Sequence, residues 1–316
     1  MKIFFVLPVY NDWDNLKVLS KQIKEISILQ NWRQVELIIV NDASTQELTT
    51  SPNPFNLKST IINLFSNQGS QRSINIGLFY LNEQISDYDY VIIMDSDGED
   101  KASDVVHLIN EAKKNAQKKI VFASRAKRNE GFIFSFFYGV YKILFRLLTG
   151  EKISVGNFSC IPKNIVKRVL SISDIWAHFS AGIIKSKLEY TMVSCDKGER
   201  FSGTSKMKIG KLFMHGITSM SVYMESIVLR FFLTSLVGMF VITIFIGIIF
   251  YIKLLTNISI LGWASTMTLG LSIIFVILLL ICFLSLLTLL GKNLNPNLPT
   301  KNKYKSFILN EQKLSE

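Results

Sequence analysis

Residues 91–100 read VIIMDSDGED, and this stretch decides the fold. It begins with four apolar residues and ends in a turn that contains Gly98, a pattern that predicts a buried central β-strand. Asp95 and Asp97 then lie at the carboxyl end of that strand, where open α/β sheets bind their ligands. Carboxylates this close repel one another unless a cation lies between them, and Mg²⁺ or Mn²⁺ accepts such oxygens together with phosphate oxygens. The stretch therefore predicts either a divalent-cation site or an acidic surface turn.

Strand and helix patterns alternate on both sides of this stretch. The predicted strands are Lys2–Val9, Val35–Val40, Ser59–Leu64, Tyr90–Met94 and Ile120–Ala123. The predicted helices between them are Leu16–Ile26, Ser70–Glu83 and Ala102–Asn115, whereas residues 156–187 show less clear periodicity. This alternation predicts an α/β fold with a mostly parallel sheet flanked by helices.

Polar side chains follow three of the predicted strands. They are Tyr10 and Asp12 after the first strand, Asp42 after the second, and Asp95 and Asp97 after the fourth. The carboxyl ends of parallel strands meet at one edge of a sheet, so these side chains are expected to converge there. That convergence is the expected geometry of a nucleotide site.

Two long apolar segments follow the α/β region. The mean hydropathy of the chain is +0.31, and Phe231–Ile252 and Leu254–Gly291 carry no charge. Each exceeds the roughly 20 residues that cross a bilayer as a helix. We therefore predict a domain over residues 1–210, a juxtamembrane helix over 211–230, membrane spans over 231–252 and 264–290, and a polar, poorly ordered tail over 291–316.

Basic residues flank the two spans and are sparse between them. Arg230 and nearby lysines precede the first span, lysines of the tail follow the second, and Lys253 is the one basic residue in the connection. Because basic flanks stay in the cytoplasm, both termini are predicted to be cytoplasmic, in a two-span protein of a bacterial-type inner membrane. The net charge of +11 suits anionic lipid and phosphate-bearing substrates, and the sequence carries no nucleic-acid-binding motif. Gly238 and Gly247 would allow the spans to pack in a homo-oligomer.

Residues 132–148 form an aromatic and weakly basic segment. Phenylalanines and tyrosines recur along it, with Lys142 and Arg146 interspersed. The segment is too short and too charged to span a bilayer, so it predicts an amphipathic helix in the membrane interface. The alternative is an ordinary core helix of the α/β domain.

Six motifs occur in a fixed order along residues 1–210. They are PVYN at 8–11, VNDAS at 40–44, NQG at 67–69 with NIG at 75–77, MDSDGED at 94–100, SR at 124–125 and RFSGTSK at 200–206. With these motifs the chain resembles glycosyltransferase family 2, which has the GT-A fold. Within that family it looks most like the polyprenyl-phosphate glycosyltransferases related to dolichol-phosphate mannose synthase.

The resemblance implies a role for each matching residue. Pro8, Tyr10 and Asp12 would border the nucleotide base and ribose, and Asp42 would hydrogen-bond one of them. Asp95 and Asp97 would hold a Mg²⁺ or Mn²⁺ ion and the donor diphosphate, because a metal neutralises the charge of the leaving nucleotide. Four residues would close over the donor diphosphate and the acceptor phosphate with charge-assisted hydrogen bonds: Arg125, Arg200, Ser205 and Lys206. The alternative for Arg200 is a solvated loop charge.

Asp100 is the catalytic base that the resemblance implies, with Glu99 as an alternative base or a residue near the metal. An acceptor hydroxyl needs such a base. A lipid phosphate is already ionised, so with that acceptor Asp100 would orient the acceptor or the metal. A further alternative is that Asp100 caps the helix that begins near Ala102.

The chain departs from the family pattern at two places. Ala43 stands where the family often has glycine, which predicts that the turn there does not require a positive φ. Lys101 and Ala102 follow the acidic motif, where a pair of prolines is common.

The resemblance implies an inverting transferase at the cytoplasmic face of the membrane. It would move one sugar from a nucleoside-diphosphate donor, a UDP-sugar, to a polyprenyl phosphate of the undecaprenyl or dolichyl type. An alternative acceptor is a sugar hydroxyl on a glycolipid, as in the assembly of cell-envelope polysaccharide. A processive synthase is disfavoured because it needs more spans and a Gln-X-X-Arg-Trp motif that the sequence lacks. The alternative from another class is a membrane-anchored scaffold or a flippase-associated hairpin protein.

Overall fold

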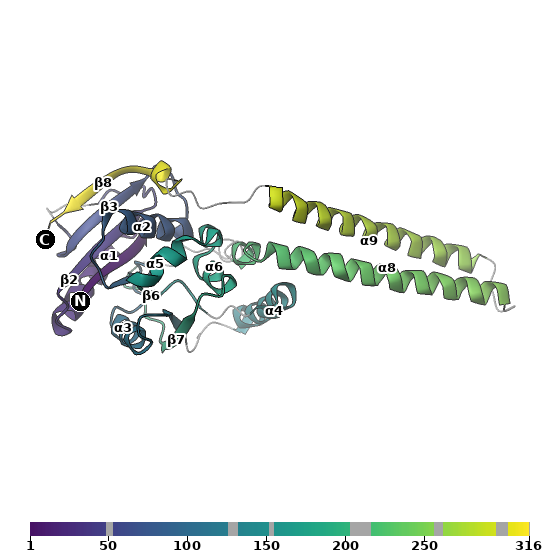
Figure 1. Ribbon diagram of the computed structural model, residues 1–316, viewed down its shortest axis with the longest axis horizontal. Coiled ribbons are helices and arrows are strands. Elements are labelled where there is room, and N and C mark those ends of the chain that lie inside the picture. The colour runs from purple at the N-terminus through teal and green to yellow at the C-terminus, as the bar shows by residue number, and fades with distance from the viewer. Residues whose placement is uncertain are drawn as a thin grey trace. The chain divides into compact units, whose positions relative to one another are not determined.

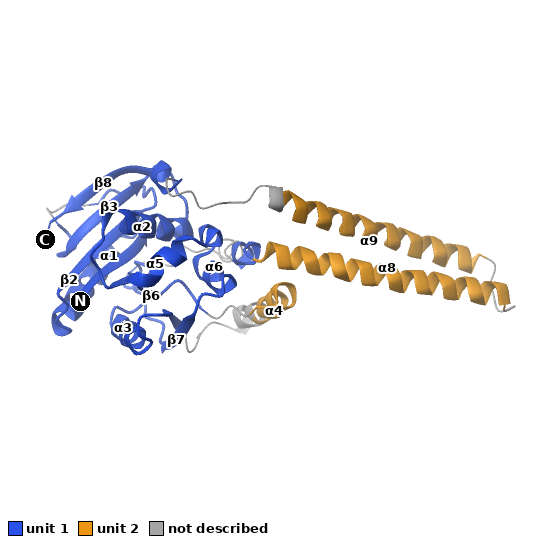
Figure 2. Cartoon of the chain, in the orientation of Figure 1, with its two compact units in different colours: residues 1–138, 153–222, 298–316 blue, residues 139–152, 223–297 orange. Residues whose placement is uncertain are grey.

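The computed structural model describes residues 1–48, 53–125, 132–151, 155–202, 216–255, 262–294 and 303–315. The chain forms two compact units, which Figure 2 distinguishes by colour. Unit 1 comprises residues 1–138, 153–222 and 298–316, and unit 2 comprises residues 139–152 and 223–297.

Unit 1 is built on a mixed β-sheet with the strand order β7-β5-β6-β4-β1-β2-β3-β8 (Figure 1). The strands are β1 Lys2–Val9, β2 Gln34–Asn41, β3 Lys58–Leu64, β4 Tyr90–Ile93, β5 Ile120–Arg125, β6 Ser159–Pro162, β7 Tyr190–Cys195 and β8 Ile308–Leu314. Strands β1 to β5 and β7 run in one direction, as predicted for a mostly parallel sheet. Strand β6 runs antiparallel between β4 and β5, and β8 runs antiparallel to β3. The five predicted strands are confirmed, whereas β6, β7 and β8 were not predicted.

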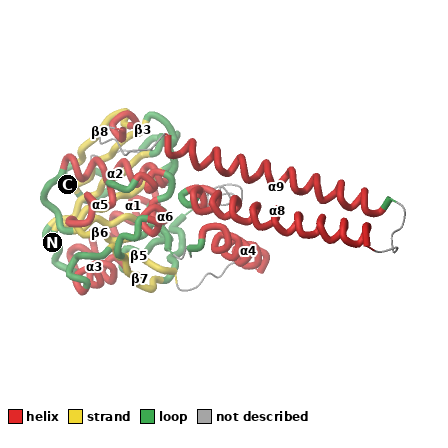
Figure 3. Tube along the Cα trace, turned by 45° about the vertical axis from the view of Figure 1, so that its right-hand side comes forward, coloured by secondary structure: helices red, strands yellow, loops and turns green. Residues whose placement is uncertain are grey.

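Helices cover both faces of this sheet (Figure 3). Helices α1 (Trp13–Leu29) and α3 (Asp104–Lys114) pack on what we call the α1 face. The opposite face, the α2 face, is covered by α2 (Ser70–Gln84), α5 (Lys163–Leu170), the 3-10 turn η1 (Ser173–Trp176) and α6 (Phe179–Lys185).

The central strand β4 is buried on both faces, as its apolar sequence predicts. Its side chains alternate between two cores: Tyr90 and Ile92 join the cluster on the α1 face, and Val91 and Ile93 join the cluster on the α2 face. Burying an aliphatic side chain of this size stabilises a fold by about 1.5–3 kcal/mol. Two opposed cores therefore fix the position at which β4 ends and the acidic turn begins.

The C-terminal tail is ordered, so the prediction of a poorly ordered tail over residues 291–316 is wrong for residues 303–315. Strand β8 pairs with β3, with Leu314 opposite Ser59 at one end and Ile308 opposite Leu64 at the other. The 3-10 turn η2 (Lys303–Phe307) precedes β8. Tyr304 is only 1% exposed; its ring stacks on Phe79 with centroids 5.9 Å apart, and its hydroxyl donates to Glu83 at 2.8 Å. The pairing satisfies the backbone groups of β3, which would otherwise be a bare sheet edge.

Unit 2 contains two helices that are long and apolar enough to cross a membrane. They are α8 (Met224–Leu255) and α9 (Trp263–Leu294). The candidate membrane span is the whole of α8, and in α9 it is Trp263–Gly291. The helices pack closely, since a Cβ atom added at Gly238 would lie 2.8 Å from Leu278. Helix α8 begins before the predicted span over 231–252 because it includes the polar residues Glu225, Ser226 and Arg230, and α9 begins at the residue before the predicted span over 264–290. In the predicted juxtamembrane segment, residues 216–221 are helical, and 211–215 lie outside the described residues.

The aromatic segment forms helix α4 (Phe132–Thr149), and its residues from Gly139 onward belong to unit 2. Phe145 packs against Tyr223 with ring centroids 5.7 Å apart. Arg230 donates a hydrogen bond to the carbonyl of Leu147 at the last turn of α4. Tyr141 and Leu148 are half-buried, and four other large apolar side chains of this part are exposed: Val140, Ile143, Leu144 and Leu147. Over residues 139–149, α4 is therefore not a core helix of the α/β unit.

Candidate functional site

The carboxyl ends of β1, β2 and β4 meet at one edge of the sheet, as predicted, and hydrogen bonds tie their loops together. The backbone N–H of Asp42 donates to Val9 at 2.8 Å, and the Ser96 hydroxyl donates to the carbonyl of Pro8 at 3.1 Å. The backbone N–H of Asn11 donates to the Ser44 hydroxyl at 2.9 Å. The predicted nucleotide-binding residues therefore share one edge, where Tyr10 is 38% exposed.

Asp42 lies at the amino end of α2 and is 4% exposed. Its two carboxylate oxygens accept hydrogen bonds from the backbone N–H groups of Gln68, at 2.6 Å, and Gly69, at 2.9 Å. Burial raises the pKa of Asp42, and these two hydrogen bonds oppose that rise. In this structure Asp42 joins the end of β2 to the start of α2, and its contact with the base or ribose stays a prediction.

Ala43 adopts a φ of 56°, so the prediction that this turn needs no positive φ is wrong. The left-handed conformation costs a residue with a side chain about 1–2 kcal/mol. Two hydrogen bonds offset that cost: the N–H of Ala43 donates to the backbone carbonyl of Asn41 at 2.9 Å, and the N–H of Ser44 donates to the side-chain oxygen of Asn41 at 3.0 Å. The prediction from alanine at position 43 failed because the neighbouring Asn41, and not residue 43 itself, holds this turn.

The acidic turn is closed by its own carboxylates. Asp100 accepts a hydrogen bond from the backbone N–H of Asp95 at 3.0 Å, and Asp97 accepts one from Glu99 at 3.0 Å. Asp100 is 6% exposed, and Gly98 has a φ of 89° that only glycine adopts readily. Asp100 therefore braces the turn that carries Asp95 and Asp97. Helix α3 begins at Asp104, later than the predicted start near Ala102, and the role of Asp100 as a base or as an orienting residue stays a prediction.

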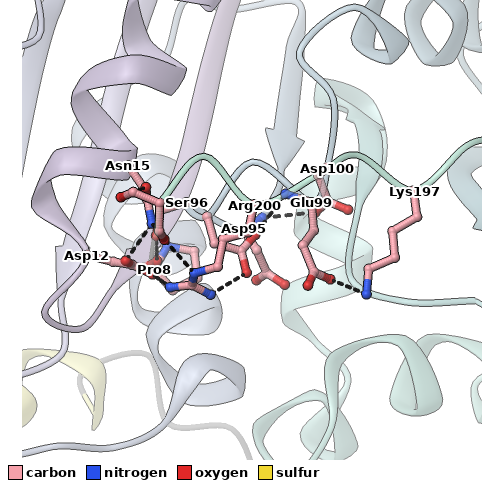
Figure 4. Close-up of polar contacts among 11 residues, drawn as sticks. Pro8, Asp12, Asn15, Asp95, Ser96, Glu99, Asp100, Lys197 and Arg200 are labelled. Atoms are coloured by element: carbon pink, nitrogen blue, oxygen red, sulfur yellow. Dashed lines mark hydrogen bonds and ion pairs between the residues drawn. The ribbon is translucent and has the colours of Figure 1, made fainter. Parts of the chain in front are cut away.

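Arg200 lies between two carboxylates that come from different loops (Figure 4). Its guanidinium pairs with Asp97 at 3.1 Å and with Asp12 at 2.5 Å. The Arg200 side chain is 15% exposed, so the alternative of a solvated loop charge is wrong. Burial raises the pKa of Asp97, and the hydrogen bond from Glu99 and the positive charge of Arg200 oppose that rise. An arginine that holds two carboxylates together can exchange one of them for the oxygens of a phosphate.

Two residues that the sequence analysis missed support this arrangement. Asn15 is 2% exposed, donates to Asp12 at 2.8 Å and accepts from the Ser202 hydroxyl at 2.7 Å. Lys197 pairs with Glu99 at 3.1 Å (Figure 4). The sequence could have indicated Asn15, because it is a polar residue among the apolar positions of α1 that face the core.

The segment 197–202 lies directly on the acidic turn. The N–H of Gly198 donates to the backbone carbonyl of Glu99 at 2.8 Å, and the N–H of Phe201 donates to the backbone carbonyl of Asp97 at 3.3 Å. A Cβ atom at Gly98 would lie 2.5 Å from the Phe201 ring, and one at Gly198 would lie 2.4 Å from the Gly98 carbonyl. Both glycines are therefore needed for this close approach. Ser205 and Lys206 lie outside the described residues, and Arg125 is the last residue of β5, with its side chain also outside them.

Asp95 and Asp97 of the acidic turn carry oxygens of the kind that ligate a divalent cation. Over the residues that the structure describes, no group of three or more His, Cys, Asp or Glu residues could hold a metal ion. Mg²⁺ is commonly bound through one or two carboxylates plus phosphate oxygens of the substrate. Asp95 and Asp97 fit that pattern, in which a phosphate ligand completes the coordination.

The sequence matches a family model described as Glycosyl transferase family 2 over residues 4–169. It is 26% identical over 291 residues to YkcC, an uncharacterized glycosyltransferase of Bacillus subtilis (strain 168), covering 87% of this chain and 85% of the relative. It is also 26% identical over 235 residues to a bactoprenol glucosyl transferase of Shigella phage SfV, covering 71% of this chain and 73% of that protein.

Two solved structures have a similar fold. One is glucosyl-3-phosphoglycerate synthase from Mycobacterium tuberculosis in complex with Mn²⁺, UDP-glucose and phosphoglyceric acid, with a TM-score of 0.51, 13% identity and coverage of 70% of this chain and 79% of that one. The other is mannosyl-3-phosphoglycerate synthase from Rubrobacter xylanophilus, with a TM-score of 0.50, 12% identity and coverage of 70% and 72%. At these identities the likeness shows a common fold.

Proposed function

The chain belongs to glycosyl transferase family 2 and is a glycosyltransferase with the GT-A fold, and from this premise we propose that it transfers one sugar from a nucleoside-diphosphate donor to a polyprenyl phosphate in a membrane. The observation that carries the proposal is the cluster of Asp12, Asp97 and Arg200 beside Asp95, at the carboxyl edge of the sheet. The same chain carries two helices able to cross a membrane. Membership of an enzyme family sets aside the scaffold alternative.

The donor we propose is a UDP-sugar, bound with its base near Pro8, Tyr10 and Asp12 and its diphosphate near Asp95 and Asp97. A solved structure of the same fold holds UDP-glucose and Mn²⁺, which supports this choice. When bound, a Mg²⁺ or Mn²⁺ ion would stabilise the negative charge that develops on the leaving nucleotide. Arg200 would move from Asp97 to the diphosphate and add a second positive charge there.

The acceptor we propose is a polyprenyl phosphate, attacked in line at the anomeric carbon with inversion. Relatives that align with 71% of this chain are named bactoprenol glucosyl transferases, which supports a lipid of this class. A phosphate monoester, with a second pKa of about 6, is ionised at neutral pH and needs no general base. Asp100 is buried and engaged with the Asp95 amide, which suits a positioning role better than proton abstraction.

The second candidate acceptor is a sugar hydroxyl on a glycolipid. Asp100 and Glu99 lie on the acidic turn, so either could take the proton that such an acceptor must lose. That reaction requires an ionisable group, whereas transfer to a phosphate does not. The two acceptors therefore predict different consequences of removing the charge of Asp100.

We propose that the enzyme is a two-span membrane protein of a bacterial inner membrane, with its catalytic unit in the cytoplasm. Helix α4 would lie in the interface, since its exposed apolar side chains alternate with Lys142 and Arg146. Basic residues flank the spans on the side of unit 1, which supports that orientation.

A nucleotide-release assay tests the proposed function. Purified protein in lipid vesicles is incubated with Mn²⁺ and, in turn, UDP-glucose, UDP-galactose, UDP-N-acetylglucosamine and GDP-mannose, with and without undecaprenyl phosphate. We expect one donor to release its nucleotide diphosphate only when the lipid phosphate is present, with the sugar recovered on the lipid. Release that does not respond to the lipid would contradict the proposed acceptor, and the absence of binding by every donor would contradict the whole proposal.

A further inference from the structure

Asn157 lies just before β6, in a part of the chain to which the sequence motifs assign no role in the site. Its side-chain oxygen is buried and has no hydrogen-bond donor among the described residues. Buried polar atoms are normally paired, and an unpaired one costs free energy that the fold must offset. Such an atom next to an active site is therefore a candidate for contact with a ligand.

The strand pairing places Asn157 beside the acidic turn. Strand β6 lies between β4 and β5, with Ser159 opposite both Ile93 and Phe122. The N–H of Ala123 donates to the carbonyl of Phe158 at 2.9 Å, so the register continues past the end of β6. Asn157 comes one residue before Phe158, at a bend in the chain, and continuing the same register would place it opposite Asp95 and Ser124.

Asn157 and Asp95 also belong to the same face of the sheet. Phe158 and Cys160 join the core on the α1 face, so the alternating positions 157 and 159 belong to the α2 face. The same alternation along β4 places Val91 and Ile93 in the core on the α2 face, and Asp95 follows two residues later. Adjacent strands lie about 4.8 Å apart, within reach of one ligand.

The order of strands along this edge matches the order of parts in a nucleotide sugar. From β2 through β1 to β4 the loops carry Asp42, then Pro8 and Tyr10, then Asp95. Asn157 follows on the next strand, on the side of β4 away from the proposed base and ribose site. A donor whose base lies over β1 and whose diphosphate lies at β4 would place its sugar at β6.

We propose that the side-chain oxygen of Asn157 accepts a hydrogen bond from a hydroxyl of the donor sugar, and that this contact helps to determine which sugar is transferred. The inference rests on the proposed function. An acceptor oxygen needs a donor, and sugar hydroxyls carry a hydrogen whereas the oxygens of an ionised diphosphate do not. Asn157 is thus a specificity residue for the sugar, distinct from the charged groups that hold the diphosphate.

Binding measurements on Asn157→Ala test the proposal. Calorimetry with Mn²⁺ gives the affinities of the wild type and the variant for UDP and for UDP-glucose, or for whichever matched pair from the donor panel the wild type binds. We expect the affinity for the nucleotide diphosphate to stay within about twofold, while the affinity for the sugar donor falls about tenfold, as for the loss of one neutral hydrogen bond. A set of monodeoxy donors then identifies the contacted hydroxyl, because the analogue that lacks it should bind both proteins equally.

Ser159→Ala is the matched control, since Ser159 donates from its hydroxyl to the Asn157 carbonyl at 2.9 Å and supports the same bend. We expect this variant to keep the affinity of the wild type for the sugar donor. The inference would be overturned if Asn157→Ala lost the same affinity for UDP as for the UDP-sugar, or lost affinity for neither. It would also be overturned if Ser159→Ala showed the same sugar-specific loss of affinity. A wild-type protein that binds no donor would overturn the proposed function as well, whereas a wild type that binds donors with unchanged affinity in Asn157→Ala would overturn the inference alone.

Discussion

Arg200 is the residue on which the geometry of the site depends most. It pairs with Asp97, 103 positions earlier, and with Asp12, 188 positions earlier, and so joins the loop after β1 to the acidic turn after β4. Its guanidinium supplies positive charge where two carboxylates would otherwise repel each other. A divalent cation that binds Asp97 competes with this pairing, and a diphosphate offers Arg200 an alternative partner.

Replacing Arg200 with glutamine should lower kcat/KM for sugar transfer by about 10²–10³, the usual loss when one preorganised charge stabiliser is removed. The same variant should bind Mn²⁺ more tightly in the absence of nucleotide, because Asp97 is released from its ion pair. Nucleotide release and Mn²⁺ titration measure the two effects. Lys197→Gln is the control: its ion pair with Glu99 is partly exposed and should matter little, so losses below about fivefold are expected. Equal activity of Arg200→Gln and the wild type would rule out a role for Arg200 at the diphosphate.

Substitution of Asp100 distinguishes the two acceptors. An asparagine keeps an oxygen that can accept from the Asp95 amide but cannot act as a base, so transfer to a lipid phosphate should fall less than about tenfold in Asp100→Asn. Asp100→Ala removes the brace as well and should lose more activity than Asp100→Asn. Nucleotide release with undecaprenyl phosphate is the measurement. Complete loss in Asp100→Asn, with the fold intact by circular dichroism, would instead support a hydroxyl acceptor and a catalytic base.

At the scale of elements, the strands and helices before residue 125 follow their local patterns closely. Strand β1 has the predicted bounds, β2 is longer than predicted by one residue at each end, and β3 and β4 differ from prediction by one residue at one end. The later strands escaped prediction for physical reasons. Strand β6 has only four residues, and β8 is an edge strand whose Asn310, Glu311 and Gln312 are exposed and carry no alternating apolar signal.

Tyr304 should be a main anchor of β8. Tyr304→Ala removes a side chain that is 1% exposed and stacked on Phe79, so we expect a destabilisation of about 3–5 kcal/mol, as for other large aromatic residues in a core. Tyr304→Phe keeps the ring and loses the hydrogen bond to Glu83, so it should cost about 1 kcal/mol. Thermal unfolding of the purified protein measures both. A melting temperature unchanged by Tyr304→Ala would mean that β8 contributes nothing to the stability of unit 1.

At the scale of the whole molecule, the chain leaves unit 1 after Val222, forms α8 and α9, and returns to unit 1 at Leu298. Both termini therefore belong to the same unit. A chain that enters and leaves a membrane on one side must cross it an even number of times, which agrees with the two candidate spans. The antiparallel pairing of β8 with β3 makes the C-terminal segment part of unit 1.

Single cysteines should report the two sides of the membrane. In intact cells, a membrane-impermeant maleimide should label Ser259→Cys, between the spans, and should label Lys313→Cys, in β8, only after lysis. The three native cysteines, Cys160, Cys195 and Cys282, are first replaced with alanine. Labelling of Lys313→Cys alone in intact cells would reverse the proposed orientation, and labelling of both sites would contradict a membrane crossing by α9.

The sequence by itself determined the alternation of strands and helices, the acidic turn after β4, and the two apolar spans. These features depend on residues that are neighbours along the chain, and the geometry of parallel strands then brings their carboxyl ends together without further information. The tertiary structure alone decided that Arg200 lies between Asp12 and Asp97, that Asp100 braces the turn, that β8 closes the edge of β3, and that β6, which follows Asn157, pairs with β4. Apart from the local contact of Asp100, these pairings join residues far apart in sequence. No local periodicity encodes them, because they result from how two packed cores position the loops at the edge of the sheet.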